Sequence, residues 1–202
     1  NDDPVLSVSS LQNSDSSTLT ETDAALTTSG NLTAADIDLT NTVSISLDRV
    51  VASGVTTGLS SNNTQLRDML TLPGDPLLSN AQTINQFTWS FDSGAQNFNY
   101  LANNERLTLT YTVELSDGIQ GSTPATHDIV IHIDGTNDDP VLVAGSISQS
   151  EDQLQNGIDI DAITSNLLSG ASDIDDLNAS LTIYSVNGAP ANVGNPVSVT
   201  LS

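Results

Sequence analysis

The sequence predicts an all-β fold made of two packed antiparallel sheets. The main observation is an alternation of apolar and polar residues with a period of two, clearest in RLTLTYTVELSDG at 106–118. Every second residue from Leu107 to Leu115 is apolar, as in an antiparallel strand with one buried face. Similar runs recur between short turn-forming segments, and helical patterns are few. Strands of this kind and spacing are typical of an immunoglobulin-like β-sandwich.

Four further runs are expected to form strands for the same reason. Trp89 lies on a central run with Phe91, and these two rings together with Tyr111 are the expected nucleus of the core. Turn signals such as SGN at 29–31, PGDP at 73–76 and SDG at 116–118 separate the runs. The runs are TVSISLDRV (42–50), FTWSF (87–91), HDIVIHI (127–133) and ASLTIYSV (179–186).

Two short segments carry a helical pattern. NTQLRDML at 63–70 is expected to form two turns, with Asn63 or Thr64 as the capping residue. FNYLANNE at 98–105 is expected to form a single turn that leads into the next strand.

The domain organisation follows from a repeat. The hexapeptide NDDPVL at 1–6 returns unchanged at 137–142. A perfect repeat at this interval predicts two homologous units in tandem, 1–136 and 137–202. The first is long enough to bury its own core. The second lacks room for the returning strands of a sandwich, so we expect an incomplete unit, either partial or split.

Charge and composition exclude several classes of function. The chain has 25 acidic residues, three arginines, no lysine and no cysteine. Nucleic acid is excluded as a partner because phosphate binding needs basic groups, and so is a polybasic membrane contact. No apolar run is long enough for membrane insertion. We do not expect an enzyme, because no nucleophile elbow or phosphate-binding loop is present.

Acidic residues gather where strands are expected to end. Because close like charges repel, a hard cation with six to eight oxygen ligands would stabilise them, and Ca²⁺ fits this donor set best. The other interpretation is a solvated, salt-tolerant surface. The pairs Asp36/Asp38 and Asp173/Asp175 occupy equivalent places in the two units. The candidate ligands are Asn1, Asp2, Asp3, Glu21, Asp36, Asp38, Asp117, Asp134, Asn137, Asp138, Asp139, Asp173 and Asp175.

Two segments of the first unit resemble a known family. The stretch FTWSFDSGAQNFNYLANNERLTLTYTVELSDG…HDIVIHIDGTNDDPVL at 87–142 is similar to the C-terminal half of a VCBS repeat, and SGNLTAADID at 29–38 to its earlier motif. VCBS repeats build large bacterial RTX adhesins that are exported by type I secretion. The second unit, from SEDQL at 150 onwards, is similar to the start of a cadherin-like repeat of the same adhesins.

The resemblance implies calcium at the joins between tandem sandwiches, as in cadherins. A cadherin join uses an acid of the first strand, an acidic linker and a D-x-D pair of the next domain. The resemblance assigns Glu21 to the first-strand acid. It assigns the linker to Asp134, Asn137, Asp138 and Asp139, and the D-x-D pair to Asp173 and Asp175. The other half of a preceding join would be Asn1, Asp2, Asp3, Asp36, Asp38 and Asp117. The linker here reads NDD where cadherins have NDN.

The expected function is therefore a calcium-stiffened extender module of a secreted adhesin on the bacterial cell surface. Such a monomeric module contacts neighbouring repeats of its own chain and presents a distal binding domain. One alternative is a calcium-dependent module that binds sugar or peptide, with the long 53–83 stretch as the place for the ligand. Another is a split scaffold domain of the same adhesin.

Overall fold

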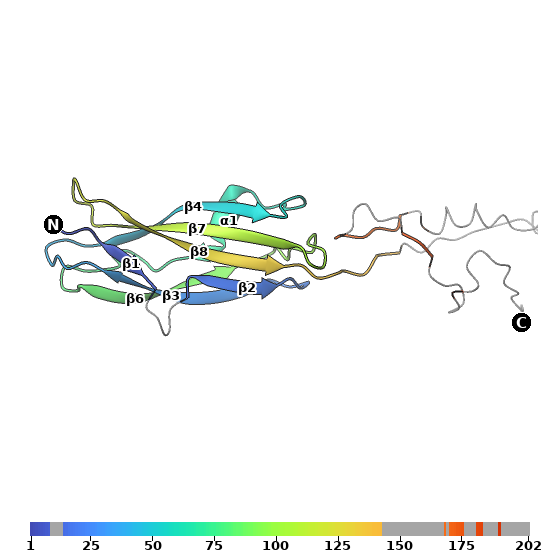
Figure 1. Cartoon of the computed structure of the whole chain (residues 1–202), viewed down its shortest axis with the longest axis horizontal. Coiled ribbons are helices and arrows are strands. Elements are labelled where there is room, and N and C mark those ends of the chain that lie inside the picture. Colours follow the sequence, from blue (N-terminus) through green and yellow to red (C-terminus); the bar gives the residue numbers. More distant parts are fainter. Residues whose placement is uncertain (9–13, 143–167, 169, 176–180, 184–189, 191–202) are drawn as a thin grey trace, which may run out of the picture. The chain divides into compact units, whose positions relative to one another are not determined.

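The computed structural model describes residues 1–8, 14–142, 168, 170–175, 181–183 and 190. The chain divides into two compact units, Asn1–Asn137 and Asp138–Ser202. The boundary lies one residue after the position given by the hexapeptide repeat. In the first unit, long strands run between two opposite ends, with the N-terminus at one end and the end of the last strand at the other (Figure 1).

Strands dominate the described part of the first unit. In chain order the elements are β1 (Val5–Ser7), β2 (Ser16–Thr20), β3 (Thr27–Ala35), β4 (Ser44–Gly54), α1 (Asn63–Asp68), β5 (Leu70–Thr71), β6 (Ile84–Asp92), β7 (Arg106–Ser116) and β8 (Ala125–Asp134).

The strands form two four-stranded sheets, which confirms the predicted all-β sandwich. One sheet has the order β1-β3-β6-β5 and the other β2-β8-β7-β4. Pairing is antiparallel except between β2 and β8, which run parallel. The N-terminal segment therefore supplies an edge strand to each layer. Because β2 and β8 are parallel, they end at the same end of the sandwich (Figure 1).

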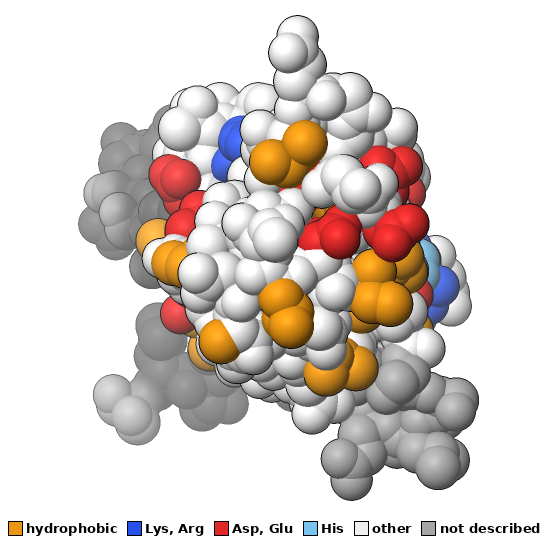
Figure 2. Space-filling model, turned by 90° about the vertical axis from the view of Figure 1, so that its left-hand side faces the viewer, with side chains coloured by type: hydrophobic (Ala, Val, Ile, Leu, Met, Phe, Trp, Pro, Cys, Tyr) orange, Lys and Arg blue, Asp and Glu red, His pale blue; other side chains and the backbone are white. Residues whose placement is uncertain are grey.

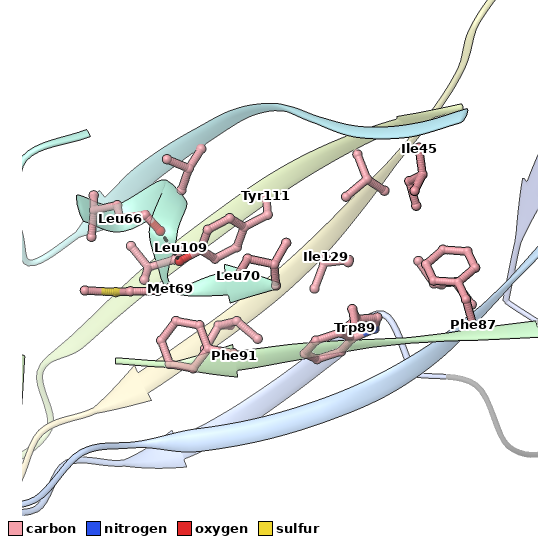
Figure 3. Packing of buried hydrophobic residues seen from close by; sticks show 14 of the residues in the cluster. Ile45, Leu66, Met69, Leu70, Phe87, Trp89, Phe91, Leu109, Tyr111 and Ile129 are labelled. Atoms are coloured by element: carbon pink, nitrogen blue, oxygen red, sulfur yellow. Dashed lines mark hydrogen bonds between the residues drawn. The ribbon is translucent and has the colours of Figure 1, made fainter. Parts of the chain in front are cut away.

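The core lies between the sheets, and the predicted nucleus of Trp89, Phe91 and Tyr111 is buried in it (Figure 3). The rings of Phe91 and Tyr111 meet edge to face, with centroids 6.3 Å apart. Large aromatic side chains contribute strongly to core stability in this arrangement. All residues predicted for the apolar faces of the central strands are buried: Phe87, Trp89 and Phe91 on β6, Leu107, Leu109, Tyr111, Val113 and Leu115 on β7, and Ile129, Ile131 and Ile133 on β8.

In strand β4, the alternation of buried and exposed side chains shifts by one residue part of the way along. Ile45 is buried as the alternation predicts, but Val50 is buried as well, although it is out of step with Ile45. The register against β7 shifts between Leu47 and Arg49, so that Asp48 is the extra residue of a β-bulge. A bulge of one residue moves every later side chain to the opposite face. The strand therefore keeps an apolar face along its full length.

Helix α1 begins at Asn63, the first residue of the predicted segment, and ends at Asp68, two residues before the predicted end. Its N-cap is Asn62, not Asn63 or Thr64. The side chain of Asn62 accepts a hydrogen bond from the backbone N–H of Gln65, and the Gln65 side chain accepts one from the backbone N–H of Asn62. This reciprocal capping box satisfies two backbone donors that a helix start leaves free.

Two side chains fasten α1 to the sandwich. The hydroxyl of Tyr111 donates to the carbonyl of Leu66, at 3.0 Å, inside the core (Figure 3). The guanidinium of Arg67 donates to the carbonyls of Leu47 and Asp48 at the β4 bulge. The helix therefore covers one side of the core through specific polar contacts. In the described part of the chain, no helix has the length and apolar character needed to cross a membrane.

The single helical turn expected at 98–105 is not formed, and that prediction was wrong. Phe98 and Asn104 have φ angles of 66° and 71°, in the left-handed region, so the chain reverses twice before β7. Phe98 and Leu101 are both fully buried. The burial of these two side chains outweighs the local helical preference.

The described residues of the second unit repeat the start of the first. Val5 pairs with Ala35 where β1 meets β3, and Val141 pairs with Ser172 in an antiparallel bridge. Val141 is the counterpart of Val5 in the repeated hexapeptide. The strand expected at 179–186 lies mostly outside the described residues, and the described part of it, 181–183, belongs to no strand.

The close approach at Gly30 gives a test of the core. A Cβ at this position would lie 2.4 Å from the carbonyl oxygen of Ser14 and 2.5 Å from the ring of Trp89, whose indole N–H donates to that same oxygen at 2.8 Å. We expect G30A to lower the free energy of unfolding by about 1–3 kcal/mol, because the methyl group overpacks a fixed contact. Urea denaturation would measure the change.

The matched control is G74A. A Cβ at Gly74 meets nothing within 4 Å. Its effect should stay within about 0.5 kcal/mol of wild type. Equal stability of G30A and G74A would contradict the packing described at Trp89.

Candidate functional site

The first end of the sandwich brings several predicted residues together. β1 pairs antiparallel with β3, so the start of the chain lies beside the residues that follow β3. Acidic side chains gather on one side of this end, next to exposed apolar side chains (Figure 2). We call this set the N-terminal acidic pole. Its members are Asn1, Asp2, Asp36, Asp38, Asn41 and Asp117.

Asp36 is the most buried acid of this pole. Its side chain is 3% exposed. One carboxylate oxygen, Oδ1, accepts the backbone N–H of Asp38 at 2.8 Å, and Asp38 in turn accepts the backbone N–H of Asp2 at 2.6 Å. The other oxygen of Asp36, Oδ2, is buried without a hydrogen-bond partner. A buried carboxylate oxygen without a partner is costly unless a cation or a proton satisfies it.

Asp117 lies at the end of β7 and faces the same pole. Its carboxylate accepts hydrogen bonds from the side-chain amides of Asn1, at 3.0 Å, and Asn41, at 3.3 Å, and from the backbone N–H of Ile119. Burial by itself raises the pKa of Asp117, but the hydrogen bonds from Asn1 and Ile119 outweigh it and hold the pKa below its usual value. Asp117 therefore stays ionised at neutral pH.

Asn41 is a member of the pole that sequence reasoning missed. Its amide donates to Asp117 and to the Asn1 side chain, and its Oδ1 atom is buried without a hydrogen-bond partner. A signal for it exists in the sequence, because the pattern D-I-D-x-x-N at 36–41 recurs at 173–178.

Asp3 differs from the other predicted residues of this end. Its carboxylate accepts the hydroxyl of Ser122 at 3.0 Å and the backbone N–H of Thr123 at 2.9 Å. These contacts tie the N-terminal segment to the connection between β7 and β8. The structure therefore gives Asp3 a fastening role within the fold, and Asp3 is left out of the pole.

Glu21 lies at the opposite end of the sandwich, directly after β2. Its side chain is 1% exposed. The oxygen Oε2 accepts the hydroxyl of Thr136 at 2.7 Å and the backbone N–H of the same residue at 3.2 Å. The second oxygen, Oε1, is buried without a hydrogen-bond partner. Glu21 therefore presents the same kind of unsatisfied acceptor as Asp36.

Asp134 is engaged in a different interaction from the one predicted. It lies directly opposite Arg106 in the pairing of β7 and β8. The guanidinium donates two hydrogen bonds to the carboxylate, at 2.5 and 2.8 Å. These bonds lower the pKa of Asp134. Because both oxygens already accept from Arg106, we leave Asp134 out of the ligand set proposed below.

The second unit repeats one contact of the N-terminal acidic pole. The backbone N–H of Asp138 donates to Asp175 at 3.0 Å, as that of Asp2 donates to Asp38. The Oδ1 atom of Asp175 is buried without a hydrogen-bond partner. Asn137, Asp138 and Asp173 each have interaction partners in the molecule, and Asp139 is exposed.

Carboxylates alone do not complete a metal shell at either end. Among the residues that the structure describes, no three Asp, Glu, His or Cys side chains are grouped so as to hold a metal ion. A shell would need amide and carbonyl oxygens as well, which Ca²⁺ accepts readily. The buried acceptor oxygens of Asp36 and Asn41 fit this requirement, because they are hard oxygen donors without another partner.

Comparisons with known proteins identify no relative. No family model and no curated protein matches the chain. Among solved structures, the chain is similar to the ASH/PapD-like domain 7 of human CEP192, at 12% identity and a TM-score of 0.37, covering 65% of this chain and 84% of that one. It is also similar to the CooA pilin subunit of enterotoxigenic Escherichia coli, at 16% identity and a TM-score of 0.34, covering 68% and 99%. Scores this low support no functional inference.

The pairing of Arg106 with Asp134 predicts a pH dependence. The folded pKa of Asp134 lies below its unfolded value, so the pair stabilises the fold above that unfolded value, about 3.9. The stabilisation is lost as the pH falls through this value towards the folded pKa. We expect R106Q to be less stable than wild type at neutral pH, with a difference that shrinks in acid, as measured by urea denaturation. The effect should be small because the pair is partly exposed.

The control for this experiment is R49Q, which removes one positive charge from an exposed pair with Asp48. It corrects for the change in net charge, so the specific effect is the difference between the two variants. If R106Q and R49Q had parallel stability curves across the acid range, the proposed effect of Arg106 on Asp134 would be wrong.

Proposed function

We propose that this chain is a calcium-stiffened extender module of a secreted bacterial surface protein. The observation that carries the proposal is that the same acidic contact is built twice. An Asp backbone N–H from the repeated hexapeptide donates to the second acid of a D-I-D pair in both units. In both units the pair also carries a buried carboxylate oxygen without a partner, on Asp36 and on Asp175.

The physical argument is electrostatic. The chain carries a formal net charge of −22, and a large share of the acids stands where strands end. Without a cation, carboxylates at such an end repel each other and leave neighbouring modules free to swivel. Calcium bound at each pole would neutralise the charge and fix one module against the next. The proposed ligands at the first pole are Asn1, Asp36, Asp38, Asn41 and Asp117. Those of the second unit are Asp138, Asp139, Asp173 and Asp175.

The proposed role is mechanical, with extracellular localisation on a bacterial surface. Extracellular modules bind Ca²⁺ weakly, with Kd values of about 0.1–1 mM. Because metal binding is coupled to folding, the chain would stay loosely structured where calcium is scarce and become rigid after export. The resemblance to VCBS repeats supports the same role. In this proposal the module is a monomer, and its partners are neighbouring repeats of the same chain.

A second candidate function has one observation in its favour. The 53–83 stretch forms one wall of a cavity of about 410 Å³, and the turn after β6 forms the other. The Gln96 side chain accepts the hydroxyls of Ser60 and Ser61 at this cavity, at 2.9 and 3.0 Å. A polar cavity of this size suits a sugar or a short peptide. The remaining lining residues are Gln65, Asp68, Met69, Asp92, Ser93, Gly94 and Ala95.

Calcium titration tests the main proposal on the full chain. If Kd is about 1 mM, about 10 mM Ca²⁺ should stabilise the fold by about 1.4 kcal/mol and raise Tm by about 3–6 °C. X-ray scattering should show a narrower distribution of chain dimensions in calcium than in chelator. The double variant D36N/D117N should lose part of both responses, because it removes charged donors of the first pole.

The control is D48N, which removes an exposed acid at the β4 bulge that belongs neither to the pole nor to the cavity. It should respond to calcium like wild type. Unchanged Tm and unchanged dimensions of the wild-type chain across the titration would exclude calcium stiffening.

The cavity is tested with an array of glycans and short peptides, in the presence of calcium. If the cavity binds a ligand, S61A should weaken the signal because Ser61 lines the cavity. S46A, an exposed serine-to-alanine change on β4, should leave the signal intact. Absence of any ligand for wild type, or equal loss in both variants, would exclude this cavity as the binding site.

A further inference from the structure

A groove of about 480 Å³ lies on the first unit where the starts of β1 and β6 flank the end of β3. Val5, Ala35 and Ile84 stand directly opposite one another in the strand pairing, so their side chains share one face of the sheet. We call it the β1–β6 groove. Its other lining residues are Asp2, Asp3, Asp36, Ile37 and Thr83.

One wall of the β1–β6 groove is apolar and exposed. The exposed fractions are 55% for Val5, 71% for Ile37 and 63% for Ile84. The next row of paired residues on the same sheet face is polar and consists of Ser7, Thr33 and Gln86. The apolar surface is therefore confined to the groove. Exposed apolar side chains that are grouped in this way, beside polar ones, are typical of a surface that binds a partner.

The other wall of the groove is acidic. It contains the carboxylates of Asp2, Asp3 and Asp36. Asp36 is the buried one of the three, and its Oδ2 atom has no hydrogen-bond partner. A partly buried charge is screened by salt less than a charge on an open surface. The groove therefore favours a ligand that combines a positive charge with apolar groups.

The basic residues of this chain are already engaged elsewhere. The chain has no lysine, and its three arginines all lie in the described part of the chain. Arg49 and Arg106 are in ion pairs, and the guanidinium of Arg67 donates to two backbone carbonyls of β4. A second copy of the chain would also bring a net charge of −22 and be repelled. Charge complementarity thus points to a different protein.

We propose that the β1–β6 groove binds a segment of a partner protein in which a lysine or arginine stands next to aliphatic residues. The aliphatic residues and the methylene groups of the basic side chain pack against Val5, Ile37 and Ile84. The positive end of that side chain lies against the carboxylates of the acidic wall, which gives the interaction its specificity.

This inference goes beyond the proposed function, because it assigns a partner other than neighbouring repeats and needs no calcium. The two proposals share Asp36. If Asp36 holds calcium as proposed above, the ion and the basic segment compete for it. Calcium would then lower the affinity of the groove for the segment.

Peptide binding to the full chain in the presence of chelator tests the proposal, followed by NMR chemical-shift changes. The probe is the peptide GIKIG, blocked at both ends. GSKSG keeps its charge without the apolar groups, and GIQIG keeps the apolar groups without the charge. We expect GIKIG to shift the groove resonances and to bind at least about fivefold more tightly than either comparison peptide, because each lacks one part of the complementary surface.

Two variants locate the binding in the groove. D36N removes a charge but keeps an oxygen that can accept the backbone N–H of Asp38, and it should weaken GIKIG binding about tenfold. I84T removes part of the apolar wall from an exposed position, and it should weaken binding about fivefold.

The matched controls are D48N and V51T. Each makes the same kind of change at an exposed residue of β4 that does not line the groove. Both should bind GIKIG like wild type, and circular dichroism would verify that every variant is folded.

The outcomes separate this inference from the proposed function. Equal binding of GIKIG and GSKSG, equal loss in D36N and D48N, or no binding of GIKIG would overturn the groove as a binding site. Selective loss in D36N and I84T supports it, even if the chain shows no response to calcium. Weaker GIKIG binding in calcium supports the shared use of Asp36. GIKIG binding that calcium does not change leaves the groove standing and counts against Asp36 as a calcium ligand.

Discussion

The contact between the aromatic face of β6 and the apolar faces of β7 and β8 is the interaction on which the rest of the first unit depends. Trp89 and Phe91 pack there against residues of the opposite sheet, including Tyr111, which also holds α1 through Leu66 (Figure 3). Because this contact fixes the lengthwise register of both sheets, it also fixes where each strand ends. The residues of the candidate functional site lie at or close to these strand ends.

The strand ends have to accommodate a large excess of negative charge. Because the chain has only three arginines, few acids can be neutralised by ion pairs. Asp134 is one of these few, since it pairs with Arg106. At opposite ends of the first unit, Asp36 and Glu21 each accept hydrogen bonds through one carboxylate oxygen, from backbone N–H or hydroxyl donors. The other oxygen of each is buried without a hydrogen-bond partner.

The repeat gives the clearest link between sequence and proposed mechanism. Val141 and Asp138 make the contacts that Val5 and Asp2 make in the first unit. In both units one partner is the residue before the D-I-D pair and the other is the second acid of that pair. A surface formed by chance would not be expected to recur with the same backbone donors. The recurrence supports the proposed role of this contact at the start of each unit.

The sequence by itself determined the all-β fold, the buried faces of β6, β7 and β8, and the acidic character of the strand ends, because alternation and burial are local patterns that a period of two reveals. Only the tertiary structure decided which acids keep free oxygens. Arg106 faces Asp134 because of the β7–β8 register, Asn99 meets Asp23 across the sandwich end, and Phe98 leaves the helical region because its ring is buried. Each depends on partners distant in the chain, so no local pattern could have predicted it.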